Sequence, residues 1–248
     1  MSTFALNSTM LRSHTGTLEV HLLGLVDFDS VLGLQEHLVY NLSGCSDVSG
    51  VLLLCEHPPT ISMGREATRR DLRIDDQELV RREMDVHWVS RGGGAFTHAP
   101  GQLAIYLLLP LQDLEVGLAG FHTLFESAVW STCRELKIPA KRRPHEPGLW
   151  SRGGQLAYFG ASVRSWISCH GMYLNVAVDP QFLEMTSTNP VGERATSMQS
   201  QRLRPISMSQ VRESLIRRIS SHFGYEMLDV STGHPLLTRT SRRVCIHA

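Results

Sequence analysis

The sequence has no excess of charge of either sign, no regular cysteine spacing and no long apolar run. Lys plus Arg and Asp plus Glu each number 24 in 248 residues. This balance argues against a general nucleic-acid binder and against binding to an anionic membrane. The five cysteines are odd in number and irregularly spaced, so we expect reduced thiols and no disulfide framework.

The hydrophobic pattern of the sequence also predicts no membrane-spanning segment and no secretory signal. The longest apolar stretch, 103–111, has about half the length of a membrane-spanning helix, and Pro110 interrupts it. The first residues show no basic segment followed by an apolar block, so we expect no secretory signal. We therefore expect a cytoplasmic protein that spans no membrane.

The chain has the composition of a folded protein, with 42% hydrophobic and 19% charged residues. Hydrophobic periodicity predicts strands at 17–26, 50–57, 85–90, 102–110, 148–150, 155–163 and 170–178. It predicts helices from Asp27 or Asp29 to Gly44, and at 77–84, 118–136 and 208–223, with a Ser207–Gln210 capping box before the last. The order of the elements favours an α/β protein of the α+β kind with a mixed or antiparallel sheet.

One domain is expected over 1–230, followed by a loose tail over 231–248. The linker-like stretch 138–147 is too short to mark a domain boundary.

The strongest candidate for chemistry is the glycine-rich block SRGGGAFTHAPGQ at 90–102. Glycines let a backbone approach a ligand closely, and Arg91 adds a planar fork of donors. The block forms neither the dinucleotide fingerprint nor a P-loop. A plain glycine-rich turn with a surface histidine is the alternative interpretation.

Other reactive groups carry weaker patterns. Cys169 lies beside His170, and a thiol next to an imidazole can become nucleophilic, although neighbours on a strand point to opposite faces. C-x-H occurs as Cys55/His57 and Cys245/His247, but this spacing matches no usual zinc site. No G-x-S-x-G is present, so a serine triad is unsupported. We expect no metal and no cofactor.

A series of blocks resembles the lipoyl(octanoyl) transferases, which belong with the biotin- and lipoate-protein ligases. In the family's order they are EHPP at 56–59, MGR at 63–65, R-G-G-x-x-x-x-H-x-P-G-Q at 91–102, GLW at 148–150, HGMYLN at 170–175 and TSM at 196–198. The resemblance covers about 50–200 and implies a single ligase-like domain, a mixed sheet with packed helices.

The resemblance also implies an activity in lipoate biosynthesis. Family members move an octanoyl group from octanoyl-acyl carrier protein to a lysine on a lipoyl domain of 2-oxoacid dehydrogenases or on the H protein of glycine cleavage. The residues implied to line the acyl pocket are Arg91, Gly92, Gly93, Gly94, Ala95, Phe96, Thr97, His98, Tyr158, Phe159, Gly160, Gly171, Met172 and Tyr173.

Two departures from the family pattern concern its chemistry. The family uses a cysteine nucleophile and a lysine that lowers the pKa of its thiol; here Gln155 stands at the lysine position, and Thr188 or Asn189 at the cysteine position. Two hypotheses follow. One is an acyltransferase that uses Cys169 as a relocated nucleophile or transfers the acyl group directly to lysine. The other is an inactive relative that binds acyl or lipoyl groups or carrier domains.

Overall fold

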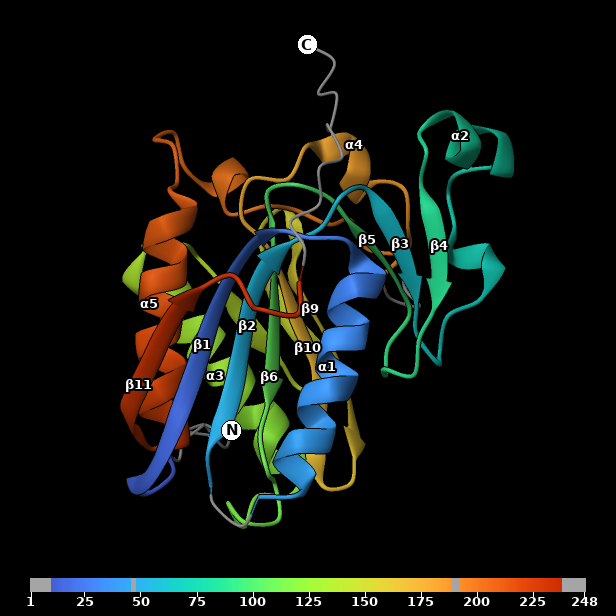
Figure 1. Ribbon diagram of the computed structural model, residues 1–248. Helices are drawn as coiled ribbons and strands as arrows, with labels where there is room; N and C mark the ends of the chain where they lie inside the picture. The colour runs from blue at the N-terminus through green and yellow to red at the C-terminus, as the bar shows by residue number, and fades with distance from the viewer. Residues whose placement is uncertain (1–9, 46–47, 189–191, 238–248) are drawn as a thin grey trace.

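The computed structural model describes residues 10–45, 48–188 and 192–237. Two sheets organise the chain (Figure 1). The large sheet has eight strands in the order β11-β1-β2-β6-β10-β9-β8-β7, and the small one has three in the order β4-β3-β5. In the large sheet β11 and β2 both pair with β1 in parallel, and the remaining pairs are antiparallel. The predicted mixed sheet is therefore confirmed.

The strands have the following bounds: β1 His14–Leu25, β2 Gly50–Glu56, β3 Thr60–Met63, β4 Asp85–Trp88, β5 Ala95–His98, β6 Gln102–Leu108, β7 Lys141–Arg143, β8 Glu146–Ser151, β9 Gly154–Arg164, β10 Ile167–Asn175 and β11 Tyr225–Thr232. The helices are α1 Phe28–Ser43, α2 Asp76–Arg81, α3 Leu118–Glu135, α4 Pro180–Leu183 and α5 Met208–Phe223, with 3₁₀ turns at Arg69–Asp71 and Gln199–Gln201.

The two faces of the large sheet carry different helices, α1 on one and α3 with α5 on the other (Figure 1). Successive side chains of β2 point to opposite faces of the sheet, and they show how the sequence provides an apolar surface for both layers of helices. Leu52 and Leu54 pack in the core cluster that contains α3 and α5, whereas Val51 and Leu53 pack in the cluster that contains α1. A strand buried on both faces needs such a continuous apolar run. In the described part of the chain, no helix has the length and apolar character needed to cross a membrane.

Capping residues in the sequence predicted two helix ends correctly, and a third predicted cap does not form. The side chain of Asp27 accepts the N–H of Ser30 and caps α1, and Gly224 has φ 78° after α5. The predicted capping box of Ser207 does not form, because its hydroxyl bonds that of Ser209.

Four strands lie outside the predicted set. They are β3, β5 within the glycine block, β7 within the linker-like stretch, and β11, which runs through Thr232 and so includes the first two residues of the predicted tail. Residues 238–248 of that tail are outside the described part of the chain.

Candidate functional site

Arg91 is fully buried, and its guanidinium is bonded to the protein's own oxygens. Nη1 donates to the carbonyl oxygens of Gly92 and Gly94 at 2.9 and 3.0 Å. Nη2 donates to the carbonyl and hydroxyl oxygens of Ser62 at 2.8 and 2.7 Å. The guanidinium carbon lies 3.7 Å from the ring centroid of Phe96. Burial lowers the pKa of Arg91 to about 10, so it remains charged at neutral pH and holds the glycine block against β3.

His98 belongs to a buried chain of hydrogen bonds that crosses from the small sheet to the large one. Its Nδ1 lies 2.7 Å from Oε1 of Gln102, and its Nε2 lies 2.7 Å from the hydroxyl of Ser62. Because Oε1 only accepts, Nδ1 carries the proton and Nε2 accepts from Ser62. Gln102 donates to Asn175 at 2.9 Å, and Asn175 donates to Tyr158 at 3.0 Å. Burial keeps the pKa of His98 well below its usual value, so the ring is neutral and its role here is to orient partners.

The side chains implied to line an acyl pocket are mostly buried, but they are divided between the two faces of the large sheet: Phe96, Tyr158 and Tyr173 lie on the α1 side. The ring of Phe96 stacks on that of Tyr158 at 5.0 Å, and Tyr173 packs edge-on at 5.8 Å from Phe96. Ala95, Phe96, Thr97 and His98 form β5, and Thr97 bonds the hydroxyl of Thr186 at 3.0 Å. Phe159 and Met172 pack in the core cluster on the α3 side.

Two of the implied glycines are needed for close packing of backbone. A Cβ on Gly160 would lie 2.8 Å from the carbonyl oxygen of Gly92, and one on Gly171 would lie 2.0 Å from that of Ile105. The first contact lets the glycine block lie on β9, and the second lets β10 pair with β6. Gly93, at φ 79°, donates its N–H to Glu66 at 3.1 Å.

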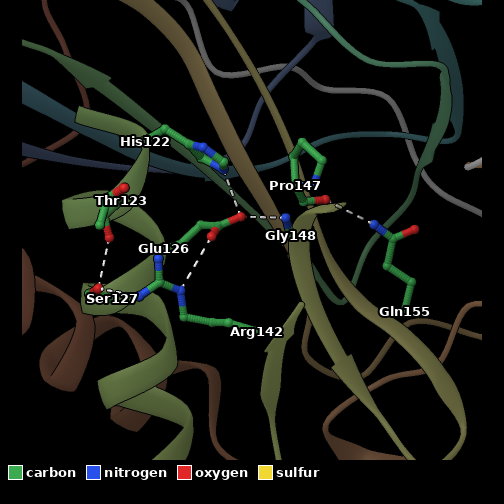
Figure 2. Close-up of polar contacts among 8 residues, drawn as sticks. All are labelled: His122, Thr123, Glu126, Ser127, Arg142, Pro147, Gly148 and Gln155. Atoms are coloured by element: carbon green, nitrogen blue, oxygen red, sulfur yellow. Dashed lines mark hydrogen bonds and ion pairs between the residues drawn. The ribbon is translucent and has the colours of Figure 1, made fainter. Parts of the chain in front are cut away.

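Gln155 and Thr188, the residues that the resemblance puts at or next to the family's lysine and cysteine positions, contact each other. Oγ1 of Thr188 donates to Oε1 of Gln155 at 2.7 Å, and both side chains are buried. A Cβ on Gly94 would lie 3.5 Å from the carbonyl oxygen of Thr188, so the pair sits beside the glycine block. Nε2 of Gln155 points to the carbonyl oxygen of Pro147 at 3.4 Å (Figure 2). The alternative position, Asn189, is outside the described residues.

Cys169 lies apart from that pair on the α1 side of the sheet, where it packs with the second core cluster. Its Sγ approaches the carbonyl oxygen of Ile167 at 3.6 Å, and partial burial raises the pKa of the thiol. Burial lowers the pKa of His170 to about 4, so the imidazole is neutral at pH 7 and provides no charge to stabilise a thiolate. Burial outweighs the opposing effect of the Arg164 cation on the pKa of Cys169, and the role of Cys169 as nucleophile stays a prediction.

Cys55 and His57 lie 3.6 Å apart in the core, where burial raises the pKa of the thiol and lowers that of the imidazole to about 4. Cys245 and His247 fall outside the described residues. Within 10–45, 48–188 and 192–237, no group of three or more His, Cys, Asp or Glu is arranged to hold a metal ion.

Sequence reasoning missed several polar residues that organise this region: Ser62, Asn175 and, on α3, Glu126. Glu126 is 4% exposed, and its carboxylate accepts from His122, Arg142 and the N–H of Gly148 (Figure 2). The signal available was a single carboxylate between Phe125 and Ala128 in the apolar face of a helix.

Comparisons with known proteins identify a family and several relatives of this chain. The family model for the lipoyl protein ligase A/B catalytic domain matches residues 27–220. The octanoyltransferase of Syntrophotalea carbinolica is 32% identical over 205 residues, which cover 82% of this chain and 93% of that protein. The octanoyltransferase of Geobacter metallireducens is 31% identical over 199 residues, which cover 79% and 89%.

Solved structures share the fold at low identity. The bipartite lipoate protein ligase of Thermoplasma acidophilum, studied with its E2 lipoyl domain, superposes with a TM-score of 0.68 at 17% identity, covering 91% of this chain and 89% of that one. Lipoate-protein ligase A bound with ATP superposes with a TM-score of 0.69 at 15% identity, covering 90% and 91%. From the matched domain, the full-length relatives and the ordered motif blocks, the chain belongs to the lipoyl protein ligase A/B catalytic domain family.

Proposed function

We propose that this chain transfers an octanoyl group from octanoyl-acyl carrier protein to the ε-amine of a lysine on a lipoyl domain, a step of lipoate biosynthesis. Support comes from relatives named octanoyltransferase that align over most of both chains. A lipoyl domain as acceptor is consistent with the ligase of similar fold that was studied with its E2 lipoyl domain. The four described cysteines are free thiols, which suits a cytoplasmic location.

The observation that carries the proposal is the hydrogen bond from Thr188 to Gln155 beside the glycine block. If Gln155 and Thr188 stand at the positions of the family's two reacting groups, as the resemblance implies, those positions are in contact, with a hydroxyl and an amide in place of a thiol and an ammonium. An amide oxygen is too weak a base to take the proton of a threonine hydroxyl, whose pKa lies far above neutrality. A covalent acyl-threonine is therefore not part of the proposal.

Direct transfer needs no protein nucleophile. The neutral ε-amine of the acceptor lysine attacks the thioester carbonyl, the new C–N bond forms, the C–S bond breaks, and the proton lost by nitrogen goes to the departing thiolate of the carrier. The protein contributes by holding both reactants in a reactive geometry, which can supply several kcal/mol or more of rate enhancement. The hydroxyl of Thr188, which donates to Gln155, lies beside the glycine block, where the thioester is expected.

The Thr188–Gln155 pair also favours a second candidate function, binding without transfer. Neither Thr188 nor Gln155 carries charge, so the site could hold octanoyl or lipoyl groups without transferring them. The two candidates predict different outcomes in one assay.

The assay incubates the purified chain with octanoyl-acyl carrier protein and an apo lipoyl domain, and follows both proteins by intact mass. Direct transfer predicts octanoylation of the acceptor lysine above the rate without protein, with no hydroxylamine-labile adduct on the chain and an unchanged rate in Cys169→Ser. Saturable binding of the donor without transfer would establish the second candidate. A cysteine-linked acyl adduct would contradict direct transfer.

A further inference from the structure

Glu126 binds a backbone peptide from within the buried part of α3. Its Oε1 accepts the N–H of Gly148 and Nε2 of His122, the latter at 2.8 Å, and its Oε2 accepts Nε of Arg142 at 3.4 Å (Figure 2). A buried carboxylate is costly unless donors compensate it. Three donors converge on this one, and one of them is a main-chain group of β8.

The peptide unit that Glu126 holds also contacts the candidate site. The N–H of Gly148 and the carbonyl of Pro147 belong to the same planar peptide, so fixing one fixes the direction of the other. That carbonyl oxygen faces Nε2 of Gln155 at 3.4 Å, and this leaves Oε1 of Gln155 directed at the hydroxyl of Thr188 at 2.7 Å. One peptide thus lies between the carboxylate on α3 and the amide of the pair.

The absence of a side chain at 148 makes this approach feasible. Gly148 has φ 120°, and a Cβ there would lie 2.3 Å from the carbonyl oxygen of Ala157 and 3.0 Å from Nε2 of Gln155. The backbone at this point therefore adopts a conformation that suits glycine, and it does so where the Gln155 amide passes over it.

The same carboxylate also bonds a histidine that packs on one of the side chains implied to line the acyl pocket. His122 and Gly148 both donate to Oε1 of Glu126, and the ring centroids of His122 and Phe159 lie 4.2 Å apart. Glu126 therefore contacts, through one oxygen, groups that lie against two parts of the candidate site.

We propose that Glu126 is a positioning residue for the Thr188–Gln155 pair and acts through the Pro147–Gly148 peptide. The inference rests on the proposed function, because that pair is the candidate place of octanoyl transfer. Glu126 is assigned no contact with the reacting groups. Its effect lies in holding residue 155 at the distance and angle that residue 188 requires.

A chemical probe at position 188 tests this without an octanoyl donor. The probe protein carries Gln155→Lys and Thr188→Cys, which is expected to place an ammonium near the carbonyl oxygen of Pro147 and next to a thiol. An ammonium within about 4–6 Å lowers the pKa of a thiol by roughly one unit or more. The rate of alkylation of the new thiol as a function of pH then reports how well residue 155 is held.

Two variants at 126 separate the hydrogen bond from the charge. Glu126→Gln keeps an oxygen that can accept from Gly148 and removes the charge. Glu126→Asp keeps the charge but withdraws the carboxylate by about 1.5 Å, one carbon–carbon bond. Ser127→Ala is the matched control, because Ser127 is equally buried on the same turn and bonds Arg142 at 2.8 Å without contacting the peptide.

The expected pattern is an alkylation rate at pH 7 that falls about fivefold or more in Glu126→Asp, from a higher thiol pKa, and stays within about twofold in Glu126→Gln and Ser127→Ala. The proposal would be overturned if the alkylation rate fell in Glu126→Gln but was retained in Glu126→Asp. An equal change of the rate in all three variants would overturn it as well. If the natural chain transfers no octanoyl group while this pattern holds, the proposed function fails and the positioning role of Glu126 stands.

Discussion

Replacing Arg91 by methionine tests whether this arginine is a structural anchor of the glycine block. The change leaves the carbonyl oxygens of Ser62, Gly92 and Gly94 and the hydroxyl of Ser62 without their guanidinium donors. Each buried acceptor that loses its partner lowers the free energy of unfolding by about 1–3 kcal/mol, and removal of the buried charge offsets part of this loss. We expect a net loss of about 3 kcal/mol in the free energy of unfolding.

For a chain of this size, 1 kcal/mol corresponds to a shift of about 2–4 °C in Tm, so Arg91→Met should unfold roughly 6–12 °C lower than the natural chain. Thermal and urea unfolding followed by circular dichroism measure it. Arg164→Met is the control, because its ion pair with Glu36 is exposed and contributes little. A Tm of Arg91→Met within about 2 °C of the natural chain would refute the reasoning and return the guanidinium to the role of a ligand contact.

The other predictions concern reactivity and pH. Cys169 should react with iodoacetamide at pH 7 more slowly than the exposed Cys45, because burial raises the pKa of Cys169; mass spectrometry of the alkylated peptides checks this, and faster labelling of Cys169 would contradict it. The free energy of unfolding should fall as pH drops from about 6.5 towards 4, because burial lowers the pKa of His57 and of His170 to about 4 and the unfolded chain binds these protons first. Urea unfolding at several pH values measures this slope, and a flat profile over that range would show that neither ring is held neutral.

The sequence predicted most of the large sheet because its strands carry strong patterns. The continuous apolar run of β2 and the one of β6 gave both strands within about two residues, and the stripe of α3 gave that helix to within one residue at its end. The parallel pairing of β1 with both β2 and β11 has no local signature, since it depends on where the chain returns to the sheet after α1 and after α5.

The missed strands are short or are stabilised by contacts distant in the sequence. β3 and β5 have four residues each, and β5 follows three glycines whose path is set by the guanidinium of Arg91. β7 has three residues and, within the described part of the chain, pairs with β8 alone. Glycine-rich and charged stretches of this kind predict loops, and the tertiary hydrogen bonds that convert them into strands are not visible in a single segment.

The contacts of the candidate site were not predictable from the sequence. Motif order pointed to Gln155 and to Thr188 or Asn189 as replacements, and the structure adds that Gln155 and Thr188 bond each other. It also gives Arg91 an inward role, since its four bonds go to the protein itself. Glu126 could not be placed because its partners, Arg142 and Gly148, lie 16 and 22 residues away in the sequence.

Electrostatics favours a matched pair of residues at positions 155 and 188. Position 155 is 3% exposed, so a lysine there without a thiolate opposite would be a buried and uncompensated ammonium, which is costly. Position 188 is 8% exposed, so a cysteine there without the ammonium would have its pKa raised by burial and would stay protonated. Each single replacement is therefore unfavourable, whereas a hydroxyl donating to an amide satisfies both groups without charge. The neutral pair keeps the geometry that Gly148 and Glu126 support, and it leaves a site whose chemistry must come from the bound thioester and the incoming amine.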